Sequence, residues 1–143
     1  MVISKDYRER PKGKHAWDAK DKALRIGQIV RSKHAEEIVL FQVSELTSLA
    51  DFFVICSAES EPQIRAIAES VETRLTQEGM RPLSVEGREA AHWVLIDYGD
   101  VILHIFKNDT RTFYNLDSLW GDAPQTVLGD AKAELPIKKG GNG

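Results

Sequence analysis

Two apolar runs dominate the hydrophobic pattern of the chain, His92–Tyr98 and Val101–Phe106, and only Gly99 and Asp100 separate them. A Gly-Asp pair between such runs predicts a β-hairpin with a two-residue turn, because glycine readily adopts the positive φ that these turns require. Side chains alternate between the two faces of a hairpin, so the turn fixes which of them lie opposite each other. The expected pairs are Tyr98 with Val101, Ile96 with Leu103 and Val94 with Ile105 on an apolar face, and Trp93 with Phe106, Leu95 with His104 and Asp97 with Ile102 on a mixed face.

Apolar positions at helical spacing predict two longer helices. Asp18 can cap the first, which runs to about Lys33, and Gly27 inside it indicates a close contact with another element. Ser60 can cap the second helix, which Gly79 ends because glycine accepts the left-handed conformation that follows a helix.

Two short continuous apolar runs, Ile38–Val43 and Phe52–Ala58, are typical of strands covered on both faces. The eight residues between them are too few for a parallel crossover, so the two strands should be antiparallel or separated. Pro82–Val85 fits a short strand near an edge, because proline cannot donate to a ladder. Asn115 can cap a final short helix, Leu116–Trp120.

This order of elements predicts an α/β fold, with helices packed on a mixed five-stranded sheet. The length of 143 residues suits one domain, which we place at residues 17–122. Residues 1–16 are polar and basic, and we expect a flexible arm there. Residues 123–143 contain two prolines and end in KKGGNG, so we expect a mostly disordered tail.

The net charge of −3 hides an asymmetry between the two ends of the chain. Residues 1–34 hold ten Lys and Arg against four Asp and Glu, whereas residues 86–122 hold seven acidic and three basic residues. An acidic surface does not suit a phosphate backbone, so little direct nucleic-acid contact is expected. It suits a basic protein partner. Acidity that only keeps a domain soluble is the alternative interpretation.

Cys56 is the only cysteine, which excludes an internal disulfide and a cysteine-rich metal site. This usage predicts a reducing compartment and a cytoplasmic location. No apolar run approaches the roughly 20 residues needed to cross a bilayer. The start of the chain lacks the apolar region of a secretory signal.

The chain has none of the phosphate-binding glycine motifs GxGxxG and GxxxxGK[ST], and no GxSxG nucleophile motif. We therefore predict no cofactor and no catalytic residue. His92, Asp97 and His104 could form a metal or acid–base site, but their spacing is not that of common metal sites, and we predict no metal. The alternative for His104 is a partly buried strand residue that a neighbour satisfies.

Six aromatic residues fall within 28 positions, interspersed with acidic ones. Core packing is the default for each of them, and Tyr98 and Phe106 are expected to serve there. Trp and Tyr near a polar rim are nevertheless typical of protein-binding hot spots. A protein-docking face is therefore favoured over an active site. The six residues are Trp93, Tyr98, Phe106, Phe113, Tyr114 and Trp120.

Three segments, SLADFFVICSAES, RPLSVEG and WVLIDYGDVILHIFKNDTRTFYNLDSLWGDAP, closely resemble the ribosomal silencing factor family (Iojap/RsfS). The resemblance extends from about Ala23 to Asp122. Its specificity lies in the combination and order of the matching positions, which are Trp93, Asp97, Gly99, Asp100, Val101, His104, Tyr114, Leu116, Asp117, Leu119 and Trp120.

The resemblance implies a nucleotidyltransferase-like fold that lacks the enzymatic apparatus. It also implies docking on the large ribosomal subunit, through its basic protein number fourteen, at the face that joins the small subunit. Bound there, the chain would block subunit joining and repress translation under nutrient limitation. The candidate partner-binding residues are Trp93, Asp97, Asp100, His104, Tyr114 and Trp120.

Two other interpretations remain open at this point, and so does the orientation of the aromatic side chains. One is a nucleotidyltransferase-like or metal-dependent enzyme, although the segment ICSAESEPQ lacks the Gly-Ser and the spaced aspartates expected there. The other is a structural module that forms homodimers through the hairpin face. Trp93 and Trp120 could each belong to the core instead of a docking patch.

Overall fold

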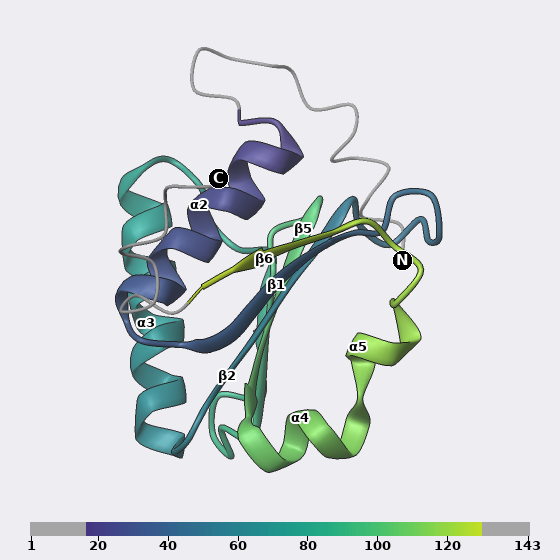
Figure 1. Ribbon diagram of the computed structural model, residues 1–143. Coiled ribbons are helices and arrows are strands. Elements are labelled where there is room, and N and C mark those ends of the chain that lie inside the picture. Colours follow the sequence, from purple (N-terminus) through teal and green to yellow (C-terminus); the bar gives the residue numbers. More distant parts are fainter. Residues whose placement is uncertain (1–16, 130–143) are drawn as a thin grey trace.

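The computed structural model describes residues 17–129 and shows helices packed on a six-stranded mixed sheet (Figure 1). The strand order is β3-β4-β5-β2-β1-β6, in which β2 and β5 are parallel and the other neighbours antiparallel. The α/β class predicted from the sequence is confirmed. The elements are α2 (Ala19–Ser32), β1 (Glu36–Gln42), β2 (Phe52–Ala58), α3 (Glu61–Gln77), β3 (Ser84–Glu86), β4 (Trp93–Asp97), β5 (Val101–Lys107), α4 (Asn108–Tyr114), α5 (Leu116–Leu119) and β6 (Gln125–Leu128).

The expectation of five strands is wrong, because β6 adds a sixth at the edge beside β1. Only Val127 and Leu128 are apolar in this four-residue strand, so it leaves no periodic signal in the sequence. Its position depends on tertiary contacts: a Cβ atom on Gly27 of α2 would lie 2.6 Å from the Leu128 side chain. The strand lies in the segment expected to be a tail, of which residues 130–143 are outside the described part, as are residues 1–16 of the predicted arm.

The hairpin follows the predicted register, with Trp93 paired to Phe106 and Ile96 to Leu103. The Tyr98 amide donates to the Val101 carbonyl at 2.9 Å, which closes the two-residue turn. Gly99 has a φ of +93°, the left-handed conformation for which glycine is suited. The antiparallel arrangement expected from the short link between β1 and β2 is also confirmed.

Helices α2 and α3 cover one face of the sheet (Figure 1). Both begin as predicted: the Asp18 side chain accepts from the Asp21 amide at 2.9 Å, and the Ser60 side chain accepts from the Gln63 amide at 3.3 Å. Their apolar stripes form a core with the sheet that includes fully buried Ile67 of α3. None of the helices described between residues 17 and 129 is long and apolar enough to span a membrane.

Helices α4 and α5 lie beside the opposite face (Figure 1). The sequence pattern did not predict α4. Asn115 occupies the predicted N-cap position of α5, which begins at Leu116 as expected, but the expected side-chain cap is absent. Asn115 has a φ of +52° and makes no side-chain cap bond, because it forms the bend that ends α4 and leads directly into α5. A second apolar cluster fills this side of the sheet, with Phe41, Phe53 and Phe106 buried.

A loop glycine fixes the start of β4. Gly87 has a φ of +85°, and a Cβ atom there would lie 2.1 Å from the Trp93 carbonyl oxygen. Gly79 has a similar φ of +92° but nothing within 4 Å of such an atom. The two glycines therefore share the same conformational requirement and differ in steric surroundings.

We predict that Gly87→Ala destabilises the domain by about 3 kcal/mol or more, because it combines left-handed strain with a backbone clash. Gly79→Ala serves as the matched control and should cost only about 1 kcal/mol, from conformational strain alone. Urea unfolding of both variants measures the difference. Equal costs at the two positions would contradict the close approach of Gly87 to β4.

Candidate protein-docking surface

The six candidate partner-binding residues divide by exposure. Tyr114 is 50% exposed, and Trp93 and Trp120 are partly buried. The remaining three are buried, with exposed fractions of 8% for Asp97, 1% for Asp100 and 5% for His104. The roles of all six residues in binding remain predictions. Only the three aromatic residues expose enough side-chain surface to contact a partner.

Asp100 is used inside the fold. Its Oδ1 lies 2.6 Å from the Lys22 Nζ of α2, and the two side chains are 0% and 5% exposed. Its carbonyl oxygen accepts from the amides of Asp51 and Phe52 at 2.8 and 3.1 Å. Asp97 accepts from the Gly99 amide at 2.7 Å. Both carboxylates therefore stabilise the hairpin turn and its attachment to α2 instead of forming an acidic patch.

His104 lies beneath Trp93 on the mixed face of the hairpin. The Trp93 Nε1 donates to the His104 Nδ1 at 3.1 Å, so the proton of the neutral ring lies on Nε2. Burial lowers the pKa of His104 to about 4, because a charged imidazole would lose its hydration there. Within residues 17–129 the Nε2 atom has no hydrogen-bond partner, and the ring packs edge-to-face against Phe53 at 5.1 Å.

His92 does not join Asp97 and His104. Its Nε2 lies 3.1 Å from the Glu61 Oε2 at the start of α3, and the side chain is 56% exposed. No cluster of three or more His, Cys, Asp or Glu side chains suited to a metal occurs among the described residues. Cys56 is fully buried, and burial raises its pKa to about 12, which leaves the thiol protonated at neutral pH.

Aromatic rings form a continuous series from the sheet to the surface. Trp93 packs on Phe106 with ring centroids 4.8 Å apart, and on Tyr114 of α4 at 4.9 Å. Tyr114 in turn contacts Phe113 at 5.0 Å, and Phe113 is 78% exposed. Trp120 packs on Phe53 from the other side at 5.1 Å. The outer end of the series is thus accessible, although its inner end belongs to the core.

We define the docking surface by its exposed or half-buried apolar side chains around α4 and α5. Sequence reasoning did not assign Phe113 and Leu119 to the site, although they are 78% and 67% exposed. The exposure of Phe113 could not be inferred from the pattern, since α4 itself was not predicted, and the short predicted helix at Leu116–Trp120 did not show which of its faces is covered. A large apolar side chain exposed beside others marks an interaction site more clearly than a scattered one. The docking surface consists of Trp93, Phe113, Tyr114, Leu119 and Trp120.

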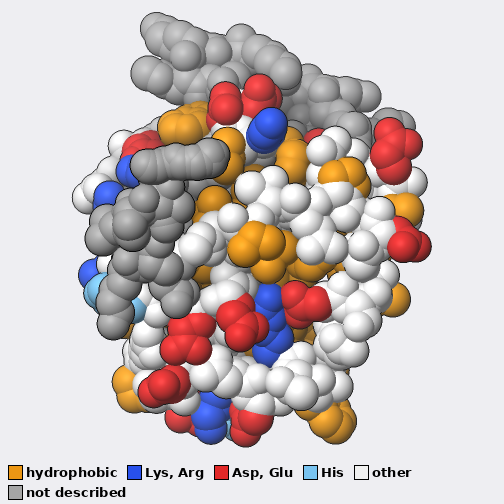
Figure 2. Space-filling view, in the orientation of Figure 1, with side chains coloured by type: hydrophobic (Ala, Val, Ile, Leu, Met, Phe, Trp, Pro, Cys, Tyr) orange, Lys and Arg blue, Asp and Glu red, His pale blue; other side chains and the backbone are white. Residues whose placement is uncertain are grey.

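Acidic side chains border this surface. Glu37, Asp109 and Asp122 are exposed, and Asp117 is half-buried. Figure 2 shows acidic side chains gathered near the start of β1 and α4, with apolar side chains exposed beside them. A rim of carboxylates around exposed aromatic groups favours a partner that carries cations around an apolar contact.

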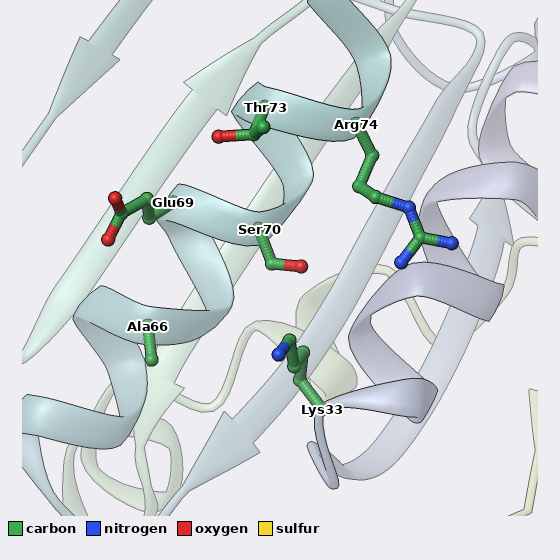
Figure 3. Close-up of a pocket in the computed structure, with 6 residues that line it drawn as sticks. All are labelled: Lys33, Ala66, Glu69, Ser70, Thr73 and Arg74. Carbon is green, nitrogen blue, oxygen red and sulfur yellow. The ribbon is translucent and has the colours of Figure 1, made fainter. Parts of the chain in front are cut away.

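Two hollows lie on the outer side of α3, on the opposite side of the sheet from the docking surface. One, of about 290 Å³, is drawn in Figure 3, where Lys33 from the end of α2 and Arg74 of α3 extend beside Ser70. The other, of about 380 Å³, is lined by residues that include Arg65 and Arg88. None of the lining side chains is buried, so neither hollow resembles an enclosed active site.

Comparison with known proteins decides the family. The model of the family described as "Ribosomal silencing factor during starvation" matches residues 16–140. The chain belongs to this family. It is 44% identical over 99 residues to the ribosomal silencing factor RsfS of Halalkalibacterium halodurans, covering 69% of this chain and 85% of that protein. Against the RsfS of Bacillus subtilis it is 41% identical over 96 residues, covering 67% of this chain and 81% of that protein.

Relatives of this silencing factor family also occur outside bacteria, and solved structures share its fold. The chloroplastic protein Iojap of Arabidopsis thaliana is 32% identical over 106 residues, covering 74% of this chain and 44% of that protein. A crystal structure of a Chromobacterium violaceum protein superposes with a TM-score of 0.72 at 28% identity, covering 81% of this chain and 98% of the other. The resemblance found in the sequence is therefore confirmed.

The buried ion pair predicts that Asp100 acts on stability. Asp100→Asn should destabilise the domain by about 3 kcal/mol, because it leaves the buried Lys22 ammonium without this carboxylate. Asp122→Asn, at an exposed acid of the rim, should change stability by less than about 0.5 kcal/mol. Urea unfolding measures both. A small effect at Asp100 would show that the pair does not hold α2 to the hairpin turn.

Burial of His104 predicts that the stability of the domain depends on pH. Because unfolding returns its pKa from about 4 to about 6.5, the unfolded chain takes up a proton that the folded chain does not. Stability should therefore fall by about 3 kcal/mol as the pH drops from 6.5 to 4. His104→Gln keeps an acceptor for Trp93 and should flatten this slope, whereas His34→Asn at an exposed position should not. Thermal unfolding across this pH range tests the prediction. If stability falls as steeply with pH in His104→Gln as in the unmodified chain, the prediction is wrong.

Proposed function

We propose that the chain is a ribosome-binding repressor of translation that docks on the large ribosomal subunit and sterically blocks joining of the small subunit under nutrient limitation. The observation that carries the proposal is the docking surface itself, whose aromatic residues are held by the fold yet remain exposed (Phe113 and Tyr114) or partly exposed (Trp93 and Trp120). Membership of a family described as silencing ribosomes during starvation supports it. The cytoplasm is the corresponding location.

Protein number fourteen of the large subunit is the partner that we propose, with little direct nucleic-acid contact. The rim acids Glu37, Asp109 and Asp122 would attract a basic protein and orient its approach. The apolar centre would then supply most of the binding energy, since desolvated aromatic contacts dominate interfaces of this kind. Occupation of the joining face is sufficient for repression, so no chemical step is required.

We further propose that the chain is not an enzyme and needs no cofactor. Asp97, Asp100 and His104, the candidate titratable residues of the hairpin, are engaged in the internal contacts described above. The nucleotidyltransferase-like fold implied by the resemblance stays a prediction. A homodimer through the hairpin face is the remaining alternative, and the experiment below separates it from docking.

Truncation of Phe113, the most exposed aromatic residue of the docking surface, tests the proposal. Phe113→Ala should weaken binding to purified large subunits about tenfold, because it removes a central apolar contact without disturbing the core. Leu83→Ala is the matched control: this side chain is 48% exposed, but its amide donates to the Asp97 carbonyl oxygen, at the opposite end of β4 from Trp93. Comigration with large subunits in a density gradient, and loss of joined ribosomes, measure the effect.

The unmodified chain should comigrate with large subunits and reduce the amount of joined ribosomes. If it stays at the top of the gradient, or sediments there as a dimer, the proposed function is wrong. Equal binding by Phe113→Ala and the unmodified chain would instead remove α4 from the interface, and with it the assignment of the docking surface.

A further inference from the structure

Arg111 is a buried cation at the base of the docking surface, with 7% of the residue exposed. Its Nε and Nη2 donate to the two carboxylate oxygens of Asp117 at 3.1 and 2.8 Å. Its Nη1 donates to the carbonyl oxygen of Glu37 at 2.6 Å and lies 3.3 Å from the Ser57 hydroxyl. One guanidinium group therefore joins four elements, namely α4, α5, β1 and β2.

The carbonyl oxygen that Arg111 uses is available because β1 is irregular. The register of β1 against β2 shifts between Glu36 and Val39, and Glu37 has a φ of +49°. A residue in such a bulge lies outside the ladder, so its carbonyl group can accept from another element. The irregular start of β1 thus provides the anchor for α4.

The same guanidinium group spans the bend between the two short helices. Asn115 forms this bend, and its amide donates to the Arg111 carbonyl oxygen at 2.8 Å. The fork between Arg111 and Asp117 then fixes the side chains on either side of the bend. The docking-surface residues of α4 precede the bend and those of α5 follow it, so the angle between the helices determines the shape of the surface.

Helix α5 needs such an external attachment. It has four residues, no buried residue of its own and no side-chain cap bond. A helix of this length is not stable by itself in water. Its half-buried Leu116 and the half-buried Trp120 that follows it pack on the apolar cluster, but apolar packing alone is not directional. A bidentate Arg–carboxylate pair does impose an orientation.

We propose that Arg111 is a positioning residue for partner binding: through Asp117, Glu37 and Ser57 it holds α4 and α5 at the angle that makes the docking surface complementary to its partner. This inference rests on the proposed function for the identity of the partner. Arg111 does not itself touch the partner, since its side chain is 8% exposed. Asp117 is 34% exposed and could also act by direct contact, which the experiment must separate.

Two conservative variants test the role. Arg111→Lys keeps the charge but loses the fork, because an ammonium group cannot make two parallel bonds to a carboxylate while also reaching Glu37. Asp117→Asn keeps the shape and removes the charge, and it provides a milder change if Arg111→Lys folds poorly. Each should weaken binding to large subunits about tenfold, which corresponds to 1.4 kcal/mol.

The readout that separates positioning from a purely structural role is local hydrogen exchange. Amide exchange should accelerate in residues 108–120 of both variants while the amides of β2 and β5 keep their protection. Arg25 and Glu78 form a matched control, a bidentate pair between the two helices of the other layer with Nε–Oε1 at 3.0 Å. Arg25→Lys and Glu78→Gln should leave both subunit binding and exchange in residues 108–120 unchanged.

Unchanged exchange in residues 108–120 of both variants would overturn the inference, whatever their binding. Weak binding by Asp117→Asn with normal exchange, together with normal binding by Arg111→Lys, would also overturn it and assign Asp117 to direct contact. If the unmodified chain does not bind large subunits, the proposed function fails. If Phe113→Ala weakens binding while these two variants bind normally, docking stands and only the positioning role fails.

Discussion

The central strands β2 and β5 carry apolar side chains on both faces, and each face must therefore be covered. Two long helices, α2 and α3, cover one face, with Ile64, Ile67 and Leu75 of α3 fully buried. The other face receives only two short helices and a bend. This incomplete cover accounts for the coexistence of a closed core and an exposed aromatic surface in so small a domain.

Polar groups inside the fold support this arrangement at both ends of the sheet. Lys22 and Asp100 connect the helix layer to the hairpin turn at one end, and Arg111 connects α4 and α5 to the bulge of β1. Both cations are buried and both face a carboxylate, as the high cost of an isolated buried charge requires. The docking surface beside Arg111 thus has a fixed internal attachment, and pre-organisation of this kind lowers the entropic cost of binding.

Sequence reasoning succeeded where a signal is local and failed where it depends on neighbours. The hairpin register followed from Gly99 and the alternation around it, and the starts of α2 and α3 followed from their capping residues. The sixth strand was missed because its pairing depends on the free edge of β1. For the candidate site, the clustering of aromatic residues could be read from the sequence, but the exposure of each side chain could not. Asp100, expected at the docking site, proved to be an internal partner of Lys22, a residue 78 positions away.

The sequence by itself determined the family, the fold class, the main helices and the hairpin, because these depend on motif order, capping and residue periodicity over short distances. Only the tertiary structure decided which acidic and aromatic side chains face outward. That choice depends on contacts between distant segments, such as Arg111 with Glu37 and Tyr114 with Trp93. Burial is a property of the assembled layers, and the same residue type can serve as core or as surface according to what packs above it.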